Sequence, residues 1–355
     1  MTLIIAEAGV NHNGDKKLAL KLIEAAHQAG ADIVKFQTFK ASKLASSEAI
    51  QAEYQVVNTK KKETQLQMLS RLELPYSIHQ ELIDYCNKLG IEFLSTAFDS
   101  ESLSFLVNDL GLTRLKLPSG EITNAPLILE HARTNCDLIV STGMATLAEV
   151  ESALGVIAFG YMKEDEEPSR EAFQRAYTSC EGQQLLQEKV TILHCTTEYP
   201  APIDDINLKA MDTLGNAFNL PAGYSDHSEG IIIPIAAVAR GAVLIEKHFT
   251  LDKNMDGPDH KASLEPAELA SMVLAIRQVE KALGNGIKSP AKSETKNIAV
   301  ARKSIIAAID IVEGDIFTSK NITIKRPGTG ISPYDYWGLL GKKAVKTFKK
   351  EEILS

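Results

Sequence analysis

The chain has 355 residues, a net charge of −8 and 44% hydrophobic residues. Its length allows two domains, or one barrel with an appendage, and its composition is typical of a globular protein. The acidic balance argues against broad electrostatic binding to nucleic acid or to an anionic membrane. No apolar run approaches the ~20 residues that span a bilayer, and the N-terminus lacks the basic region of a signal peptide.

The cysteines point to a reducing compartment. Cys86, Cys136, Cys180 and Cys195 are scattered and form no CxxC pair. We expect reduced thiols rather than a disulfide or zinc framework. With no leader sequence recognised, we predict a cytoplasmic protein.

The distribution of charge divides the chain. Residues 284–355 contain 13 Lys or Arg and 7 Asp or Glu, whereas residues 1–283 carry a net charge of −14. A change of sign on this scale indicates two units. The stretch 284–293 contains Gly, Pro and small polar residues, as linkers do. We predict a first domain at 1–283, a linker at 284–295 and a second domain at 296–355.

The first domain alternates short β-branched runs with amphipathic helical stretches. Eight strand candidates in about 280 residues predict a parallel TIM (β/α)8 barrel. A doubly wound sheet is the rival, but no strand leads into a nucleotide-binding glycine motif. The predicted strands are Leu3–Ala6, Ile33–Gln37, Glu92–Thr96, Arg114–Leu117, Leu138–Ser141, Val190–Cys195, Gly223–Ser225 and Val243–His248. The predicted helices are Lys16–Ala29, Gln80–Leu89, Ser102–Leu110, Leu147–Phe159, Ile231–Arg240 and Pro266–Leu283.

Two segments depart from this alternation. Tyr161–Lys189 is polar, and we interpret it as an insertion between the fifth helix and the sixth strand. Because it follows a helix and precedes a strand, we expect it at the N-terminal face of the barrel. The second domain has strand-like runs at Ser304–Ile309, Asn321–Lys325 and Ala344–Thr347, separated by glycine-bearing turns. These runs predict a small β-rich module.

Two histidines end neighbouring predicted strands, where a barrel gathers its chemistry. Neighbouring parallel strands lie about 4.8 Å apart, so His227 and His248 can meet at one metal ion. The carboxylate of Glu246 or Asp259 lies close in sequence, and such a set suits Mn²⁺, Fe²⁺ or Zn²⁺. A hydrogen-bonded pair of barrel histidines is the alternative that spacing alone leaves open.

Two lysines and a glutamate lie within or at the end of predicted strands. Lys35 and Lys116 are costly to bury unless they are paired. They could hold a phosphate or carboxylate, or form salt bridges to Glu7 or Glu121. Glu7 itself could act as a general base or merely pair with Lys35. The hydroxyls that could share the anion belong to Ser119, Ser141 and Ser225.

An ordered set of motifs resembles the sialic acid synthases, which are phosphoenolpyruvate-dependent nonulosonate synthases. The motifs are IAEAGVNHNG at 5–14, VKFQT at 34–38, KLPSGE at 116–121, STGM at 141–144, LHCTTEYP at 193–200, GYSDH at 223–227, IEKHFT at 245–250 and GPDH at 257–260. KRPGTG at 325–330 resembles the antifreeze-like (SAF) domain of that family. The resemblance covers the chain in order except Tyr161–Lys189.

The resemblance implies an enzyme that condenses phosphoenolpyruvate with an N-acetylmannosamine-type sugar and releases phosphate. We expect N-acetylneuraminate synthase first, and N,N′-diacetyllegionaminate synthase, acting on 2,4-diacetamido-2,4,6-trideoxymannose, as the alternative. A non-catalytic sugar-phosphate-binding barrel is the rival from another class. The family implies a divalent metal on His227 and His248, Mn²⁺ before Mg²⁺ or Co²⁺. It implies that Glu7 orients or deprotonates the water.

The resemblance also assigns binding residues. Arg326 would reach the sugar across a domain-swapped homodimer, although without the resemblance it is a surface residue in a Gly/Pro turn. Thr197 departs from some relatives, which have Asn there. The implied phosphoenolpyruvate contacts are Lys35, Thr96, Lys116, Ser119, Ser141, Thr197 and Ser225. The implied sugar contacts are Gln37, Glu121, Tyr199, Glu246, Asp259 and Arg326.

Overall fold

A computed structural model of the chain describes residues 1–163 and 165–355. Glu164, within the expected insertion, lies outside the described residues. The chain divides into two compact units, Met1–Gly284 and Asn285–Ser355. None of the described helices is long and apolar enough to cross a membrane.

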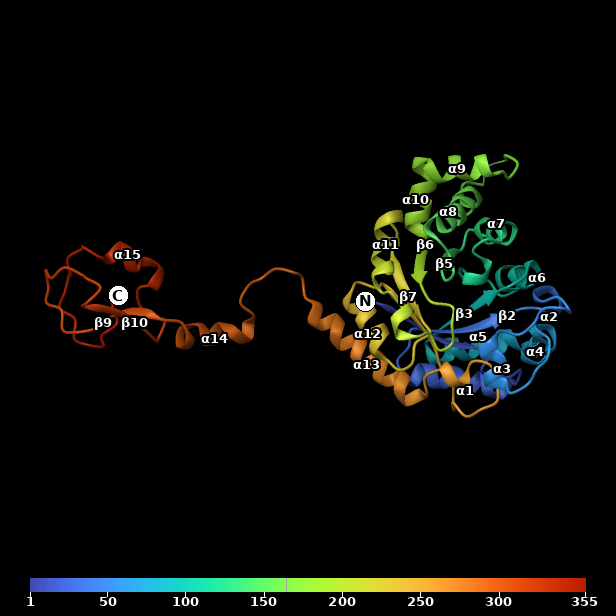
Figure 1. Cartoon of the computed structure of the whole chain (residues 1–355), viewed down its shortest axis with the longest axis horizontal. Helices are drawn as coiled ribbons and strands as arrows, with labels where there is room; N and C mark the ends of the chain where they lie inside the picture. Colours follow the sequence, from blue (N-terminus) through green and yellow to red (C-terminus); the bar gives the residue numbers. More distant parts are fainter. Residues whose placement is uncertain (164) are drawn as a thin grey trace. The chain divides into compact units, whose positions relative to one another are not determined.

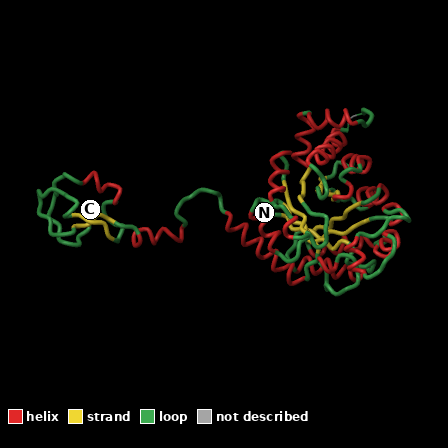
Figure 2. Tube along the Cα trace, in the orientation of Figure 1, coloured by secondary structure: helices red, strands yellow, loops and turns green. Residues whose placement is uncertain are grey.

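Eight parallel strands of the first unit close into a barrel in sequence order, with helices outside (Figure 1; Figure 2). The predicted TIM (β/α)8 barrel is therefore confirmed. Its strands are β1 Leu3–Gly9, β2 Ile33–Thr38, β3 Glu92–Ala97, β4 Arg114–Leu117, β5 Asp137–Ser141, β6 Val190–His194, β7 Ala222–Asp226 and β8 Leu244–His248.

The helices between the strands begin at local capping residues. Asp15 accepts from the backbone N–H of Lys17 at the start of α1, and Thr146 and Glu149 form a capping box at the start of α8. The helices are α1 Lys16–Gln28, α2 Ala41–Leu44, α3 Glu53–Thr59, α4 Gln65–Leu72, α5 His79–Leu89, α6 Ser100–Ser104, α7 Ala125–Arg133, α8 Leu147–Met162, α9 Arg170–Thr178, α10 Cys180–Lys189, α11 Lys209–Phe218, α12 Ile232–Ala239 and α13 Pro266–Leu283.

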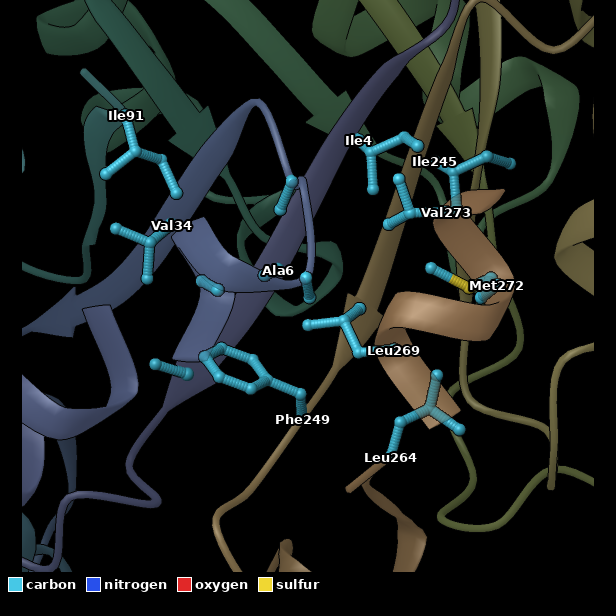
Figure 3. Packing of buried hydrophobic residues seen from close by; sticks show 14 of the residues in the cluster. Ile4, Ala6, Val34, Ile91, Ile245, Phe249, Leu264, Leu269, Met272 and Val273 are labelled. Carbon is cyan, nitrogen blue, oxygen red and sulfur yellow. The ribbon is translucent and has the colours of Figure 1, made fainter. Parts of the chain in front are cut away.

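The main core lies between the strands and the surrounding helices. Figure 3 shows Ile4 of β1 and Ile245 of β8 facing Leu269, Met272 and Val273 of α13. A second buried cluster fills the barrel interior itself. Its members are Ile5, Ile33, Leu94, Ile139, Leu193 and Leu244. Strand residues therefore alternate between the helix layer and the barrel interior, which sets the direction of every polar side chain farther along each strand.

The insertion is helical rather than a loop. Tyr161 still belongs to α8, where its hydroxyl donates to the carbonyl of Cys136 at 2.7 Å. α9 then packs along the outer side of α8 (Figure 1). Between the two helices, the rings of Phe159 and Phe173 meet edge to face with centroids 5.3 Å apart. α10 ends at Lys189, directly before β6. The insertion thus starts and ends at the N-terminal face, as expected, but α9 extends along α8.

The second unit contains α14 Lys292–Ala301, β9 Ser304–Ala307, β10 Ile322–Lys325 and α15 Tyr336–Leu339. β9 and β10 pair antiparallel over a small core that includes Ile305, Phe317 and Phe348. The expected strand at Ala344–Thr347 is wrong. Two antiparallel single bridges, Ile311 to Phe348 and Ile316 to Lys343, lie on either side of this stretch in place of a continuous ladder.

Candidate active site

The strand alternation turns the predicted site residues into the barrel. Ile5 and Ile33 face the interior, so Glu7 and Lys35, two residues farther along, face it as well. Leu94, Ile139 and Leu244 also face the interior. Two residues farther along the same strands, Thr96, Ser141 and Glu246 therefore face it as well. These side chains are almost fully buried at the C-terminal ends of the strands. The fold therefore gathers one polar cluster at that end of the barrel.

Lys35 joins two carboxylates at the centre of this cluster. Its Nζ lies 2.7 Å from Glu7 Oε2 and 3.7 Å from Glu246 Oε2, and it donates to Thr96 Oγ1 at 3.1 Å. Burial alone would lower the pKa of Lys35, but the carboxylates of Glu246 and Glu7 outweigh it and raise that pKa. Lys35 is thus a buried cation paired with Glu7.

Lys116 lies on the other side of Glu246. Its Nζ is 3.8 Å from Glu246 Oε1 and donates to the Ser141 hydroxyl. Ser225 donates to the same carboxylate oxygen of Glu246 at 3.0 Å. Burial lowers the pKa of Lys116, and the charge of Glu246 only partly offsets this. Two ammonium groups, two hydroxyls and one carboxylate therefore share a space in which a bound anion would compete with Glu246.

A glycine keeps a second group of hydroxyls close together. A Cβ on Gly143 would lie 2.4 Å from Thr197 Oγ1 and 2.8 Å from Ser119 Oγ, so no larger residue fits without displacement. The Gly143 N–H donates to Ser119 Oγ at 3.0 Å, and Ser119 also contacts the Cys195 thiol at 3.1 Å. Ser119 and Thr197 thus lie together beside Gly143; their binding of one anion stays a prediction.

Burial shifts the protonation of Glu7. Desolvation, with the charge of Glu246 adding to it and Lys35 opposing it, raises the pKa of Glu7 to about 7. Gln37 donates to Glu7 Oε1 at 3.2 Å and fixes the carboxyl plane. A carboxyl group held in one orientation with a pKa near neutrality can both accept and return a proton.

The two histidines meet at the same end of the barrel. Their ring centroids lie 5.6 Å apart, and β1 pairs Glu7 directly with His248. His227 Nδ1 bonds the carbonyl oxygen of Thr196 at 2.6 Å, so that nitrogen carries the proton and Nε2 keeps its lone pair. Burial lowers the pKa of both imidazoles, which are therefore neutral.

The donor set fits a divalent metal. His248 Nδ1 is buried without a hydrogen-bond partner, although Asp259 Oδ2 lies 4.0 Å away. Neutral imidazoles with free lone pairs are the ligands that Mn²⁺, Zn²⁺ and related ions accept. Among residues 1–163 and 165–355, no group of three or more His, Cys, Asp or Glu side chains is placed to hold a metal ion. Two histidines would leave positions open for substrate or water.

An aromatic wall borders the histidines. The Tyr199 ring lies 4.1 Å from the His227 ring and 5.6 Å from the His248 ring, measured between centroids. The Tyr54 ring of α3 packs against Tyr199 at 5.1 Å. Asp259 Oδ2 lies 4.0 Å from His248 Nδ1, and burial raises the pKa of Asp259 to about 6. Tyr199 and Asp259, both implied sugar contacts, therefore lie on the histidine side of the cluster.

Two implied sugar residues are not joined to the cluster. Glu121 follows β4 and accepts from Asn124 Nδ2 at 2.7 Å, and within the described part of the chain it forms no ion pair with either lysine. Arg326 follows β10 in the second unit and is exposed. Its role depends on a partner subunit and stays a prediction.

Comparison with known proteins assigns the family. The NeuB family matches residues 22–288, and the SAF domain matches residues 302–355. The chain belongs to the NeuB family. This membership confirms the resemblance read from the motifs and the SAF nature of the second unit.

Two curated relatives carry the same name. The NeuB chain is 52% identical over 353 residues to the N,N′-diacetyllegionaminic acid synthase of Campylobacter jejuni, covering 99% of this chain and 98% of the relative. It is 45% identical over 340 residues to the protein of that name from Legionella pneumophila, covering 96% and 89%.

A solved relative has the same fold. The crystal structure of the N-acetylneuraminic acid synthetase of Leptospira borgpetersenii, in complex with citrate, has a TM-score of 0.68 and 33% identity. The alignment covers 84% of this chain and 90% of that one. The expectation of an enzyme is confirmed with the family: the NeuB chain is a transferase, a phosphoenolpyruvate-dependent nonulosonate synthase.

Three residues of this NeuB site were assigned no role from the sequence. Tyr54 lies in a polar connection after β2, where no periodic pattern marks it. Asp226 and Lys247 form an ion pair 2.5 Å long that is at most 1% exposed, behind the two histidines. Their positions beside His227 and His248 could have drawn attention to them, because ligand neighbours often position ligands.

Proposed function

We propose that this protein is an N,N′-diacetyllegionaminate synthase, which condenses phosphoenolpyruvate with 2,4-diacetamido-2,4,6-trideoxymannose and releases phosphate. The two N,N′-diacetyllegionaminic acid synthases share 52% and 45% of its residues, whereas the N-acetylneuraminic acid synthetase of known structure shares 33%. The comparisons therefore favour this alternative over the N-acetylneuraminate synthase that we expected first.

The observation that carries the proposed chemistry is the lysine and carboxylate cluster beside the histidine pair. Phosphoenolpyruvate is an anion, and Lys35 and Lys116 supply two buried ammonium groups within 3.8 Å of Glu246. The hydroxyls of Ser141 and Ser225 already contact this cluster and can turn to a phosphate or carboxylate oxygen. We assign Thr96, Ser119 and Thr197 to the same binding role.

Glu7 is the proposed acid–base residue. Carbon 3 of phosphoenolpyruvate attacks the sugar aldehyde, water adds at carbon 2, and phosphate departs with C–O cleavage. Glu7 accepts the proton of that water, and its pKa of about 7 suits this task. Gln37 holds the Glu7 carboxyl at 3.2 Å, and Lys35 holds its other oxygen at 2.7 Å.

His227 and His248 would hold the divalent metal, with Mn²⁺ proposed first. When bound there, the metal would polarise the aldehyde oxygen as a Lewis acid. The Thr196 carbonyl at 2.6 Å fixes the tautomer of His227. Tyr199 and Asp259 border the two imidazoles, so the sugar would lie on that side of phosphoenolpyruvate. Glu246 would turn toward the sugar once an anion holds the lysines.

A direct experiment separates the two sugars. Phosphate release is measured with phosphoenolpyruvate, Mn²⁺ and either the diacetamido trideoxy sugar or N-acetylmannosamine. We expect a higher kcat/KM for the diacetamido sugar, and no release when either substrate is omitted. A higher kcat/KM for N-acetylmannosamine would instead support an N-acetylneuraminate synthase, the function that we expected first. Binding of both substrates without phosphate release would favour the non-catalytic barrel.

The metal has its own test. Exhaustive chelation should abolish turnover, and added Mn²⁺ should restore it, with Mg²⁺ and Co²⁺ as comparisons. Full activity after chelation would contradict the assignment of His227 and His248.

The proposal also includes a cytoplasmic location and a domain-swapped homodimer, in which Arg326 reaches the partner's sugar site.

A further inference from the structure

We propose that Tyr54 is a specificity-determining residue, whose ring contacts the apolar groups that the diacetamido trideoxy sugar carries and N-acetylmannosamine lacks. This inference rests on the proposed function. It assigns a role to α3, a helix between β2 and β3 that contributes no buried residue to the core. A helix without core packing has little structural reason to occupy one position.

Two contacts nevertheless hold α3 beside the site. The Tyr54 ring packs on Tyr199 with centroids 5.1 Å apart and planes tilted by 32°. One turn later, Asn58 Nδ2 donates to the carbonyl oxygen of Pro258 at 2.7 Å. Pro258 directly precedes Asp259, so both contacts join α3 to loops that carry implied sugar residues. The helix is therefore positioned by the site rather than by the core.

Tyr54 is one ring farther from the histidines than Tyr199 is. The Tyr199 ring lies 4.1 Å from the His227 ring, and Tyr54 lies on Tyr199 in turn. A sugar with its aldehyde near the histidines extends its far carbons away from them. Because C4 and C6 are at that far end, they would meet the second aromatic ring.

The chemistry of the two sugars differs at these carbons. N-acetylmannosamine has hydroxyl groups on C4 and C6, whereas the diacetamido trideoxy sugar has an acetamido group on C4 and a methyl group at C6. Two additional methyl groups favour an aromatic surface, which two tyrosine rings supply. Burial raises the pKa of Tyr54, so its neutral hydroxyl can also donate to the acetamido carbonyl.

The test compares three full-length variants with both sugars in the presence of Mn²⁺. Tyr54→Ala should lower kcat/KM for the diacetamido sugar by about 10-fold or more, mainly through KM, because pocket methyl contacts have effects of that size. The loss with N-acetylmannosamine should be smaller, and the KM for phosphoenolpyruvate should not change. Tyr54→Phe should retain the preference. Val57→Ala, on the same helix but 61% exposed, is the matched control.

The outcomes separate this inference from the proposed function. Equal losses of kcat/KM for both sugars in Tyr54→Ala would show a merely structural role and overturn the inference alone. Unchanged kinetics in Tyr54→Ala would do the same. A wild-type protein that prefers N-acetylmannosamine would overturn the proposed function and this inference with it.

Discussion

Glu7 shows how one residue takes its properties from three strands. Lys35 on β2 holds one carboxyl oxygen and Gln37 holds the other, while Glu246 on β8 adds a like charge. Gly9 adopts φ +51° next to this group, and a Cβ there would lie 3.2 Å from Glu7 Oε1. The glycine therefore leaves room for the carboxyl group in the orientation that Gln37 and Lys35 hold.

Replacing Glu7 by glutamine tests its acid–base role. Glu7→Gln keeps the size of the side chain but replaces one of the two acceptor oxygens by an NH2 group, removes the charge and cannot accept the proton. We expect kcat to fall by about 10²–10⁴-fold, while the KM for phosphoenolpyruvate changes little. Steady-state phosphate release measures both constants. A large rise in the phosphoenolpyruvate KM with unchanged kcat would mean that Glu7 serves binding only.

His248 is the residue on which the metal assignment depends most directly. Its Nδ1 is buried without a hydrogen bond, and burial holds its pKa well below the usual range. His248→Ala should therefore lose Mn²⁺ binding, seen by titration calorimetry, and lose activity, with an unchanged circular dichroism spectrum. Val243→Ala, on the same segment and 42% exposed, is a control. An active, metal-binding His248→Ala protein would contradict the assignment.

At the scale of elements, the ends of β7 and β8 are tied together behind the histidines. The register pairs Asp226 with Lys247, and Lys247 also donates to the carbonyl of Ser228. Ser228 N–H donates to Asp226 Oδ1 at 3.0 Å. Asp226 and Ser228 are the sequence neighbours of His227, so the hydrogen bonds that hold them also fix the position of the His227 imidazole.

The Asp226–Lys247 pair yields a stability prediction. Removing one member leaves the other charge buried, which typically costs about 3–5 kcal/mol of unfolding free energy. Lys247→Met and Asp226→Asn should each destabilise the barrel strongly, while the double variant should lose less than the sum of the two. Urea unfolding of all three proteins gives the coupling energy. Strictly additive losses would show that the ion pair contributes nothing as a pair.

Element prediction succeeded where the hydrophobic period was long. Pro266–Leu283 matches α13 at both ends, because a proline starts the helix and apolar residues repeat through it. The helix predicted at Ser102–Leu110 is also present, but as α6 followed by a π-helical turn at Phe105–Asp109; this change of helix type leaves no trace in the hydrophobic period. The short helices α3 and α4 were missed because they lie in a polar connection.

At the scale of the whole molecule, buried histidines predict sensitivity to acid. Burial lowers the pKa of His12 and of His260 to about 4, and also lowers the pKa of His79 and His131. The unfolded chain binds protons at these residues below about pH 6.5, whereas the folded chain does not, so stability falls as the pH falls. His12 alone should contribute a loss of about 2 kcal/mol at pH 5.

Urea unfolding of the barrel at pH 7.5, 6.5 and 5.5 measures this dependence. We expect the buried histidines to lower the free energy of unfolding as the pH falls, while Glu7 and Asp259, whose pKa values are raised to about 7 and about 6, act in the opposite direction. His131→Gln, far from the site on α7, should show a shallower dependence than the wild-type protein. A His131→Gln protein with the same pH dependence as the wild-type protein would contradict the prediction.

The proposed dimer, in which Arg326 reaches the partner's sugar site, can be tested by mixing two variants. If Arg326 completes the partner's site, Glu7→Gln and Arg326→Ala chains, each nearly inactive with the sugar, should regain activity when mixed and refolded. A mixed dimer would then contain one barrel with Glu7 that receives an intact Arg326. Sedimentation should show a dimer. A monomer, or no recovery on mixing, would show that Arg326 does not act between subunits.

The sequence by itself determined the barrel, the two units and the family, because strand and helix periods, charge balance and ordered motifs are local properties of the chain. It did not determine the direction of Glu7, Lys35 and Glu246, because both faces of their strands are apolar: in β1, Ile4 packs against the helices and Ile5 lies in the barrel interior. Only the tertiary structure decided which of these groups touch. Lys35 pairs with Glu7 and Glu246, Glu121 pairs with neither lysine, and Tyr54 lies against Tyr199. Such contacts depend on barrel closure, which brings together strands and a loop that are far apart in sequence.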